Sequence, residues 1–353
     1  MNVLIRKSGL LNRVVKKIEQ ENITYEILQG VRANPTFDLV KEGLEMAVDN
    51  GVDFLLAIGG GSVIDTAKCI AVNYYNPEGY VTDYNFHVKN PERALPIGVI
   101  LTIAAAGSEM SNSCVIQDDE SGVKKGFNSE VVRPLFAIED PKLTFGVNKE
   151  QTAYGVIDIL MHTLERYFSE SEKDDIADEF ALGLIKNVIN VGLVAFKNPE
   201  DYDSRARLML ASSLSHCGFT SVGKGYIMPV HQLEHALSGK FVKVAHACGL
   251  AILFPSWAEK YYVYDVKKFA RLGRQVFNID IKDDKDAAKA CIEAFRKYFK
   301  KLEMPTKLSE VGVKEKDIDV LADLVSEKGS RKVPHHSLPL GREEAREIYL
   351  AVL

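Results

Sequence analysis

DFLLAIGGGSVIDTAK (residues 53–68) indicates how the first part of the chain folds. Residues 53–58 form an almost continuous apolar run, which is typical of a strand buried on both faces of a parallel sheet. Gly59, Gly60 and Gly61 follow directly, and residues 62–74 then show helical periodicity. A buried strand that passes through glycines into a helix predicts an α/β layer.

The glycine turn is a candidate phosphate site. Glycines lack a Cβ, so their backbone can approach a pyrophosphate, and the N-terminus of the following helix offers free N–H donors. Ser62 and Asp65 lie at the start of that helix. A tight turn without a ligand explains three glycines equally well, and the pattern is not the Gly-x-Gly-x-x-Gly of a Rossmann first turn. Asp65 alone would be interpreted as a solvated surface residue.

A second loop of small and polar residues follows the next buried strand. PIGVILT (96–102) predicts this strand, and LTIAAAGSEMSN (101–112) places Thr102 at its end and Ser108 in the turn beyond. Small residues here would let a nicotinamide or a ribose pack against the backbone. An ordinary strand–turn–helix junction explains the loop as well.

The chain divides into two parts that differ in their predicted secondary structure. Up to residue 146, strand-like and helix-like segments alternate, with helices expected over 9–21 and 36–50 and a strand over 23–28. Beyond Gly146 the strands stop. The prediction is an α/β plus all-α protein, with a dinucleotide-binding α/β domain over 1–146 and a helical metal-binding domain over 147–353. Helices of the second part are expected over 150–169, 174–197, 203–217, 228–239, 246–263, 285–301 and 315–328, with a short one after residue 341.

The second part carries two helical half-sites for a metal. Asp158 and His162 stand four apart in DILMH, His231 and His235 stand four apart in HQLEH, and His246 follows. Residues four apart share one helix face, with Cβ atoms about 5–6 Å apart. The segment around Asp158 is otherwise apolar, and burying an unpartnered carboxylate is costly. A carboxylate and imidazoles from two helices favour Fe(II) or Zn(II) over Ca²⁺ or Mg²⁺. Each pair alone would also fit an exposed hydrogen-bonded pair or a buried core histidine.

The overall composition argues against several kinds of partner. The 353 residues are 46% hydrophobic, which is enough for two cores. A net charge of −5 and a pI near 6.0 argue against a nucleic-acid partner. The first residues do not resemble a signal peptide, and no apolar run approaches the roughly 18 residues of a membrane span. Five scattered cysteines without a Cys-x-x-Cys motif favour reduced thiols, mostly in the core, and a cytoplasmic protein.

Taken together, these motifs resemble those of the iron-containing (group III) alcohol dehydrogenases, especially their butanol-dehydrogenase-like branch. The resemblance runs over nearly the whole chain. It implies a dehydroquinate-synthase-like fold, with the active site in the cleft between a nucleotide domain and a helical domain, and a homodimer. The segments that carry it are GGGSVIDTAK (59–68), LTIAAAGSEMSN (101–112), AIEDPKLT (137–144), GVIDILMHTLERYF (155–168) and VHQLEHALSG with VAHACGLAIL (230–253).

The resemblance also implies residue roles. Asp158, His162, His231 and His246 would bind the metal. His235 would be a non-ligand histidine beside the nicotinamide and would relay a proton. The positions that match cofactor contacts of the family are Gly59, Gly60, Gly61, Ser62, Asp65, Thr102, Ser108 and Lys124.

The sequence departs from the family pattern at three places. Residues 3–15 already resemble the segment after the first βα turn, so the first strand of the nucleotide domain is expected to be missing. Ala106 stands where relatives carry Thr, which removes a hydroxyl near the cofactor. Gln29 stands where NAD-preferring relatives carry an acidic residue. An uncharged side chain there permits a 2′-phosphate, so NADP(H) is expected more than NAD(H).

The resulting hypothesis is a metal-dependent oxidoreductase that transfers a hydride between a nicotinamide cofactor and a primary alcohol or aldehyde, with Fe(II) or else Zn(II) as the metal. One alternative is a non-catalytic metal-binding remnant, truncated in its nucleotide domain. A second is a dehydroquinate-synthase-like lyase, which would need basic residues that do not cluster near the histidines. A third is a metallohydrolase, for which Glu234 would point away from His231 and His235 on an ideal helix.

Overall fold

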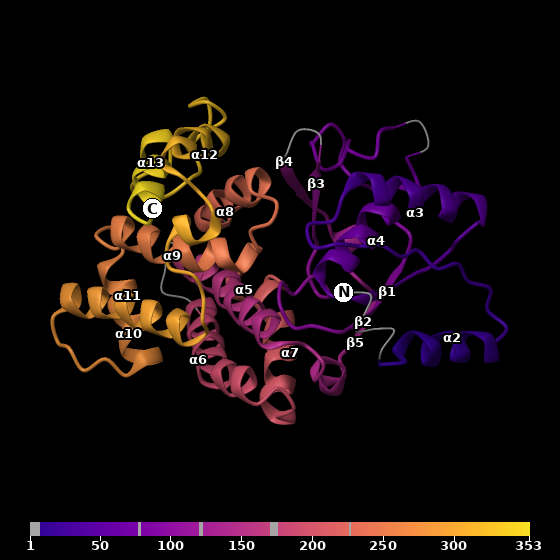
Figure 1. Ribbon diagram of the computed structural model, residues 1–353, viewed down its shortest axis with the longest axis horizontal. Coiled ribbons are helices and arrows are strands. Elements are labelled where there is room, and N and C mark those ends of the chain that lie inside the picture. The colour runs from indigo at the N-terminus through magenta and orange to yellow at the C-terminus, as the bar shows by residue number, and fades with distance from the viewer. Residues whose placement is uncertain (1–7, 77–78, 120–122, 170–175, 226) are drawn as a thin grey trace.

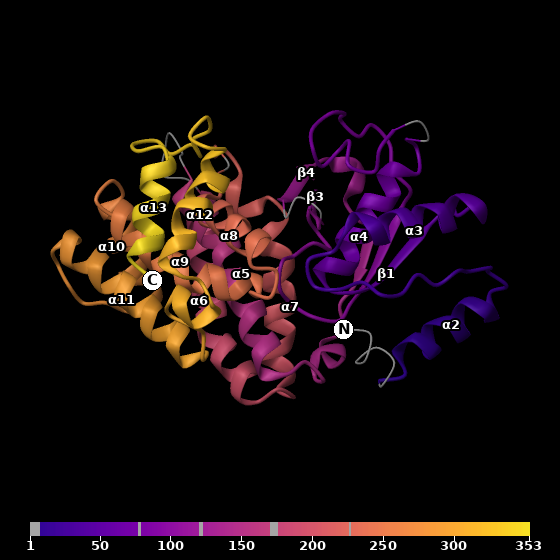
Figure 2. The same ribbon diagram turned by 45° about the horizontal axis from the view of Figure 1, so that its top comes forward.

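The computed structural model describes residues 8–76, 79–119, 123–169, 176–225 and 227–353. Its two parts lie side by side. In Figure 1 the α/β part, coloured indigo to purple, lies on the right, and the helical part, coloured from magenta to yellow, lies on the left. The turned view of Figure 2 keeps the two groups apart. Residue 146 as the boundary between two domains stays a prediction.

A small parallel sheet forms the centre of the α/β part. Its strands are β1 (Leu55–Gly59), β2 (Ile97–Leu101) and β5 (Phe136–Ile138), in the order β1-β2-β5. Every residue of β2 is buried, since the strand has a neighbour on each side. This explains why its sequence is a continuous apolar run rather than an alternating one. The two strands expected from apolar runs in this part are therefore confirmed.

Helix α4 (Gly61–Asn73) covers this sheet, and a second helix and a hairpin pack on α4. Helix α4 contacts β1, β2 and β3, and α3 (Phe37–Asp49) packs on α4. The hairpin pairs β3 (Ser113–Asp118) antiparallel to β4 (Val123–Asn128). The sequence analysis predicted neither hairpin strand. In β3, Cys114 and Ile116 are buried where the strand packs on α4.

The strand predicted over residues 23–28 is wrong. The segment has no regular secondary structure, and among the described residues no strand pairs with it. Its apolar side chains are largely exposed, Ile23 by 58% and Tyr25 by 39%. A strand sequence becomes a strand only when a neighbouring backbone completes its hydrogen bonds. Helix α2 (Leu10–Gln20), just before it, forms as expected.

The helical part forms one large core. Phe168, Trp257, Phe269 and Phe295 are among its fully or almost fully buried side chains. The helix over residues 266–277 was not predicted, whereas the other helices agree with the expected ones to within a few residues. The helices are α5 (Lys149–Phe168), α6 (Ile176–Lys197), α7 (Tyr202–His216), α8 (Pro229–Lys240), α9 (His246–Tyr261), α10 (Val266–Phe277), α11 (Asp284–Lys301), α12 (Ile318–Ser326) and α13 (Arg342–Leu350).

Helix α6 is the one described helix long and apolar enough to cross a membrane by length and composition. It packs against α5, α7 and α10, and half of its most apolar window is buried. This packing is typical of a core helix. Four of the five cysteines are also buried, as expected for small core residues.

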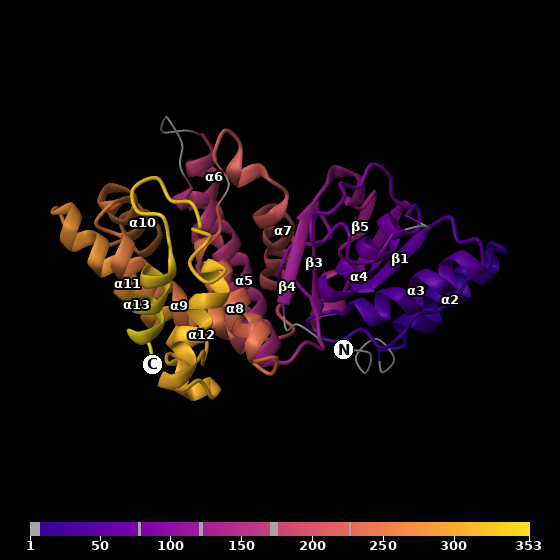
Figure 3. The same cartoon turned by 90° about the horizontal axis from the view of Figure 1, so that it is seen from above.

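The two parts meet along α5, α7 and α8. Figure 3 shows the hairpin β3–β4 between the parallel sheet and these helices, and α8 contacts β4. Gly155 of α5 marks the closest approach, because a Cβ there would lie 2.1 Å from the carbonyl oxygen of Ala104. Any other residue would push the loop after β2 away from α5. This loop and the helices form the walls of the cleft between the two parts.

Candidate metal and cofactor site

Helix α5 supplies the first half of the histidine cluster. Its N-terminus is fixed by Asn148, whose side-chain oxygen accepts a hydrogen bond from the backbone N–H of Gln151 at 2.8 Å. Asp158 and His162 are both buried on the helix face toward the cleft. The Nε2 atom of His162 lies 3.4 Å from Oδ1 of Asp158. The i, i+4 spacing in the sequence thus becomes a direct contact.

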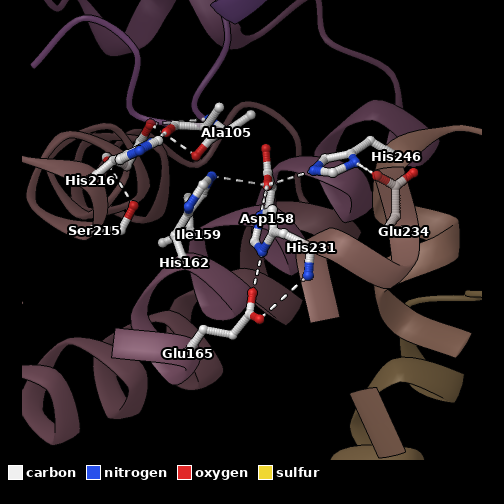
Figure 4. Close-up of polar contacts among 12 residues, drawn as sticks. Ala105, Asp158, Ile159, His162, Glu165, Ser215, His216, His231, Glu234 and His246 are labelled. Atoms are coloured by element: carbon white, nitrogen blue, oxygen red, sulfur yellow. Dashed lines mark hydrogen bonds and ion pairs between the residues drawn. The ribbon is translucent and has the colours of Figure 1, made fainter. Parts of the chain in front are cut away.

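Helices α8 and α9 supply the second half. His231 lies in the first turn of α8, and His246 is the first residue of α9. The Nε2 atoms of both rings lie 3.9 Å from Oδ1 of Asp158. Figure 4 shows three imidazoles converging on this carboxylate from three helices. The four residues proposed from the sequence as metal ligands are therefore neighbours in space.

The arrangement fits a divalent cation. Oδ1 of Asp158 and Nε2 of His231 are buried and have no hydrogen-bond partner among the described residues. One ligand atom each of Asp158, His231 and His246 lies within 4.8 Å of the others. His162 lies outside this three-residue set, although it contacts Asp158. Burial lowers the pKa of His162 well below its ordinary value, so the ring is neutral and keeps a lone pair for a metal.

Two buried glutamates, Glu165 and Glu234, orient the imidazoles. Neither role was predicted from the sequence. Glu165 contacts Nδ1 of His231, and Glu234 contacts Nδ1 of His246. In each case the ring can donate its Nδ1–H to the carboxylate and present Nε2 toward Asp158, an arrangement common around metal-bound histidines. Oε1 of Glu165 also accepts a 2.6 Å hydrogen bond from the backbone N–H of Val230 at the start of α8. Glu165 at i+3 from His162 was the available sequence signal.

A cleft of about 1330 Å³ extends from this cluster to the glycine loop. Residues of both parts line it, including Ser62 and Ser108 at one end and the four cluster residues at the other. The volume exceeds that of a typical single-ligand pocket. A dinucleotide and a small substrate can therefore fit together.

The three glycines have different roles in packing and in lining the cleft. A Cβ on Gly59 would lie 2.5 Å from the side chain of Val63, and one on Gly60 would lie 2.3 Å from Ile103. These two glycines are required by packing within the chain, and neither lines the cleft. Gly61 lines the cleft, and a Cβ there would meet Ala106 at an ordinary 3.5 Å. Within this loop, Gly61 and Ser62 are the residues placed to meet a phosphate.

Asp65 and Ser108 belong to one hydrogen-bond network at the floor of the cleft. The Ser108 hydroxyl donates to Oδ1 of Asp65 at 2.6 Å, and the backbone N–H of Val115 donates to Oδ2 at 3.0 Å. Buried Lys68 donates to the carbonyl and hydroxyl oxygens of Ser108 at 2.7 and 3.0 Å. Burial lowers the pKa of Lys68 to about 8. Asp65 and Lys68 therefore fix the loop that carries Ser108.

The remaining predicted residues divide into two groups. Lys124 and His235 line the cleft, and Nζ of Lys124 reaches Oδ1 of Asn34 at 3.2 Å. The His235 ring lies 5.6 Å from the His246 ring, and burial lowers the pKa of His235 well below its ordinary value. Thr102 and Gln29 do not line the cleft, and Gln29 is exposed.

A further histidine near the cluster, His216, is partly buried and was not predicted from the sequence. It ends α7, lines the cleft, and places its ring centroid 4.1 Å from that of His162. Burial lowers the pKa of His216 well below its ordinary value. It belongs to no i, i+4 pair, so no spacing signal indicated it.

Two family models match this chain. The model described as "Iron-containing alcohol dehydrogenase" matches residues 2–141. The model described as "Fe-containing alcohol dehydrogenase family, C-terminal" matches residues 152–351. Together they cover nearly the whole chain.

Individual relatives agree with the family models. The NADH-dependent butanol dehydrogenase A of Clostridium acetobutylicum is 40% identical over 90% of this chain and 82% of its own length. The NADPH-dependent aldehyde reductase YqhD of Escherichia coli is 33% identical over 98% of this chain and 89% of its own length. The crystal structure of the NADH-dependent butanol dehydrogenase A of Thermotoga maritima superposes with a TM-score of 0.93 at 32% identity, covering 99% of this chain and 88% of that one.

Proposed function

We propose that Asp158, His162, His231 and His246 hold the catalytic cation of this chain. The chain belongs to the iron-containing alcohol dehydrogenase family and is a nicotinamide-dependent oxidoreductase of alcohols and aldehydes. The observation that carries the proposal is the convergence of three Nε2 atoms on Oδ1 of Asp158, at 3.4, 3.9 and 3.9 Å. We propose Fe(II) as the metal, with Zn(II) as an acceptable substitute for this donor set.

The chain's own residues divide the work of the reaction. When bound, the cation supplies Lewis acidity to the substrate oxygen, and the nicotinamide carries the hydride. Glu165 and Glu234 hold His231 and His246 with their Nε2 atoms toward the cation. His235 takes the proton released from the alcohol and passes it along the cleft toward solvent.

The glycine loop holds the cofactor at the other end of the cleft. Gly61 and Ser62 present the N-terminus of α4 to the pyrophosphate, where backbone N–H groups and the helix dipole favour an anion. Ser108 and Lys124 also line the cleft and would contact the cofactor there. Gly59, Gly60, Asp65 and Thr102 support the loop, since their contacts are within the chain.

We propose NADP(H) as the preferred cofactor. Gln29 carries no negative charge to repel a 2′-phosphate. The guanidinium of Arg32, three residues on, is half exposed and pairs with Asp119, and residues 33–35 line the cleft. We also propose that the protein works as a cytoplasmic homodimer on a primary alcohol or aldehyde such as butanal. Size-exclusion chromatography with light scattering tests the dimer.

The central experiment measures oxidation of NADPH and NADH with butanal by protein loaded with Fe(II), Zn(II), Co(II) or Mn(II). Turnover with at least one metal, abolished by a chelator, is the expected result. A folded protein that binds none of these metals would contradict the proposed site. Equilibrium dialysis with NADPH separates this reading from a metal-binding remnant, which would retain the metal but not the cofactor.

A further inference from the structure

One nitrogen of His216 has a fixed role. Its Nδ1 lies 2.6 Å from the carbonyl oxygen of Ala106. A carbonyl oxygen can only accept a hydrogen bond, so Nδ1 carries the proton. In the neutral ring the lone pair then resides on Nε2. The contact with Ala106 therefore sets the tautomer of His216.

The position of the ring is fixed as well. It packs on the ring of His162 with centroids 4.1 Å apart and an angle of 31° between the planes. The hydroxyl oxygen of Ser212, one turn earlier on α7, accepts a 3.1 Å hydrogen bond from the backbone N–H of Ala105. Gly107, at φ +68°, is so close to α7 that a Cβ there would lie 2.3 Å from the carbonyl oxygen of Ser212. Loop 105–107 and the end of α7 thus form one rigid unit.

The second nitrogen, Nε2, has no hydrogen-bond partner among the described residues, although the side chain lines the cleft. His216 is also not part of the three-residue set of Asp158, His231 and His246. As Figure 4 shows, its ring lies beside the cluster on the side of the 105–107 loop. A rigid acceptor is therefore held between the proposed cofactor loop and the proposed metal ligands.

We propose that Nε2 of His216 accepts a hydrogen bond from an N–H or O–H group of a molecule bound in the cleft. This inference rests on the proposed function. Two sources offer such a donor beside the cluster: the carboxamide of the nicotinamide, and a second hydroxyl on the substrate, as in a hydroxyaldehyde or a diol. His216 then determines either cofactor affinity or the preference for hydroxylated substrates.

Two substitutions separate the nitrogens of the ring. His216→Asn keeps an N–H group near the position of Nδ1, for the contact with Ala106, and removes the acceptor at Nε2. His216→Gln can place its amide oxygen near the position of Nε2 and gives up the contact with Ala106. The pair therefore distinguishes loss of the acceptor from loss of the structural contact. Circular dichroism and thermal unfolding establish that each variant is folded.

The experiment has a binding arm and a kinetic arm. The binding arm measures the Kd of NADPH by fluorescence titration of the folded, metal-loaded protein. The kinetic arm compares KM for butanal with KM for 3-hydroxybutanal. If the donor is the carboxamide, H216N raises the Kd about tenfold, as expected for one lost hydrogen bond. If it is a substrate hydroxyl, H216N leaves the Kd unchanged and raises KM for 3-hydroxybutanal alone by a similar factor. H216Q restores most of either effect.

The outcomes separate this inference from the function on which it rests. Wild-type protein that binds neither NADPH nor a divalent metal refutes both. Wild-type protein that is active, together with folded H216N that matches it in the Kd of NADPH and in both KM values, refutes the role of His216 alone. A loss in H216N that H216Q does not restore at all also overturns it, because the contact with Ala106 would then be the cause.

Discussion

The carboxylate of Glu165 contacts Nδ1 of His231, and both side chains are almost fully buried between α5 and α8. Oε1 of the same carboxylate accepts hydrogen bonds from the backbone N–H groups of Val230 and His231, at 2.6 and 3.3 Å. Glu165 therefore caps α8 and fixes the tautomer of His231 at the same time. A substitution that keeps the shape of Glu165 but alters its hydrogen bonding should weaken metal binding.

Glu165→Gln is expected to weaken metal binding. If the amide oxygen keeps the hydrogen bonds to the start of α8, the NH₂ group faces Nδ1 of His231 and pushes the ring into the tautomer with a proton on Nε2. The Kd for Zn(II) or Fe(II), measured by competition with a chromogenic chelator, should rise about 10- to 100-fold. Glu150→Gln, on the first turn of the same helix, is the control and should have no effect. Equal metal affinity of E165Q and wild type would contradict the role of Glu165 in orienting His231.

Asp158→Asn tests the unpartnered carboxylate. Without metal, the variant should be at least as stable as wild type, because Oδ1 of Asp158 is buried with no hydrogen-bond partner among the described residues. Metal at 100 times its Kd should stabilise wild type by about 2.7 kcal/mol and the variant by much less. Thermal unfolding with and without chelator measures both quantities, and exposed Asp203 provides the control D203N. The idea fails if metal raises the Tm of D158N as much as that of wild type.

Lys68→Met tests the lysine beneath the cofactor loop. Nζ of Lys68 lies 2.7 to 3.1 Å from five oxygens of Ser108, Ser111 and Ser113. Leaving such buried acceptors unsatisfied costs about 1–3 kcal/mol each, so urea unfolding at pH 7 should show a loss of at least about 3 kcal/mol. The Kd of NADPH should also rise, since the loop that carries Ser108 loosens.

The same variant predicts a pH dependence. Burial lowers the pKa of Lys68 from its ordinary 10.5 to about 8 in the folded protein. Between these two values the unfolded chain binds more protons than the folded one, so wild-type stability rises with pH relative to K68M. Below pH 8 both states are protonated and the difference is constant. Urea unfolding at pH 7, 8, 9 and 10 measures it, and a difference that does not change above pH 8 would contradict the buried lysine.

A shared serine predicts the opposite pH trend. The Ser213 hydroxyl lies 2.6 Å from Oε1 of Glu109 and 2.7 Å from Oε1 of Glu139. The Ser213 hydroxyl can donate its proton to only one of the two carboxylates, and burial raises the pKa of both glutamates. The folded state therefore binds more protons than the unfolded one above the ordinary glutamate pKa, and stability falls as pH rises through the raised values.

Glu139→Gln should flatten this trend, because its amide can donate to Ser213 at any pH. The stability of E139Q relative to wild type should increase from pH 5 to pH 8 in urea unfolding. Exposed Glu200 provides the control E200Q, which should follow wild type. A stability difference between E139Q and wild type that stays constant across this range would contradict the raised pKa of Glu139.

Gln29→Glu tests the cofactor preference. A negative charge at this position should repel a 2′-phosphate and leave NADH affected much less. The ratio of the Kd values for NADPH and NADH should therefore rise about tenfold, the effect of roughly 1.4 kcal/mol. Fluorescence titration gives both constants. An unchanged ratio would place the 2′-phosphate away from Gln29.

Features that depend on neighbours along the chain were predictable from the residues alone. Apolar runs predicted β1 and β2, helical periodicity predicted most of the helices, and i, i+4 spacing predicted the contact between Asp158 and His162. Backbone geometry sets these relationships over one or two turns, so no tertiary information is needed. The family motifs then related the glycine loop to the histidine pairs.

Which distant groups meet depends instead on how the elements pack in three dimensions. Residues 23–28 have the pattern of a strand, yet no strand of the described part of the chain pairs with them. Glu165 meets His231, and Glu234 meets His246, only because α5, α8 and α9 pack together. His216 reaches the cluster from α7, across a loop that tolerates only Gly107 at its closest point. Such contacts depend on how helices pack and on hydrogen bonds between residues far apart in sequence, which the spacing within one segment does not determine.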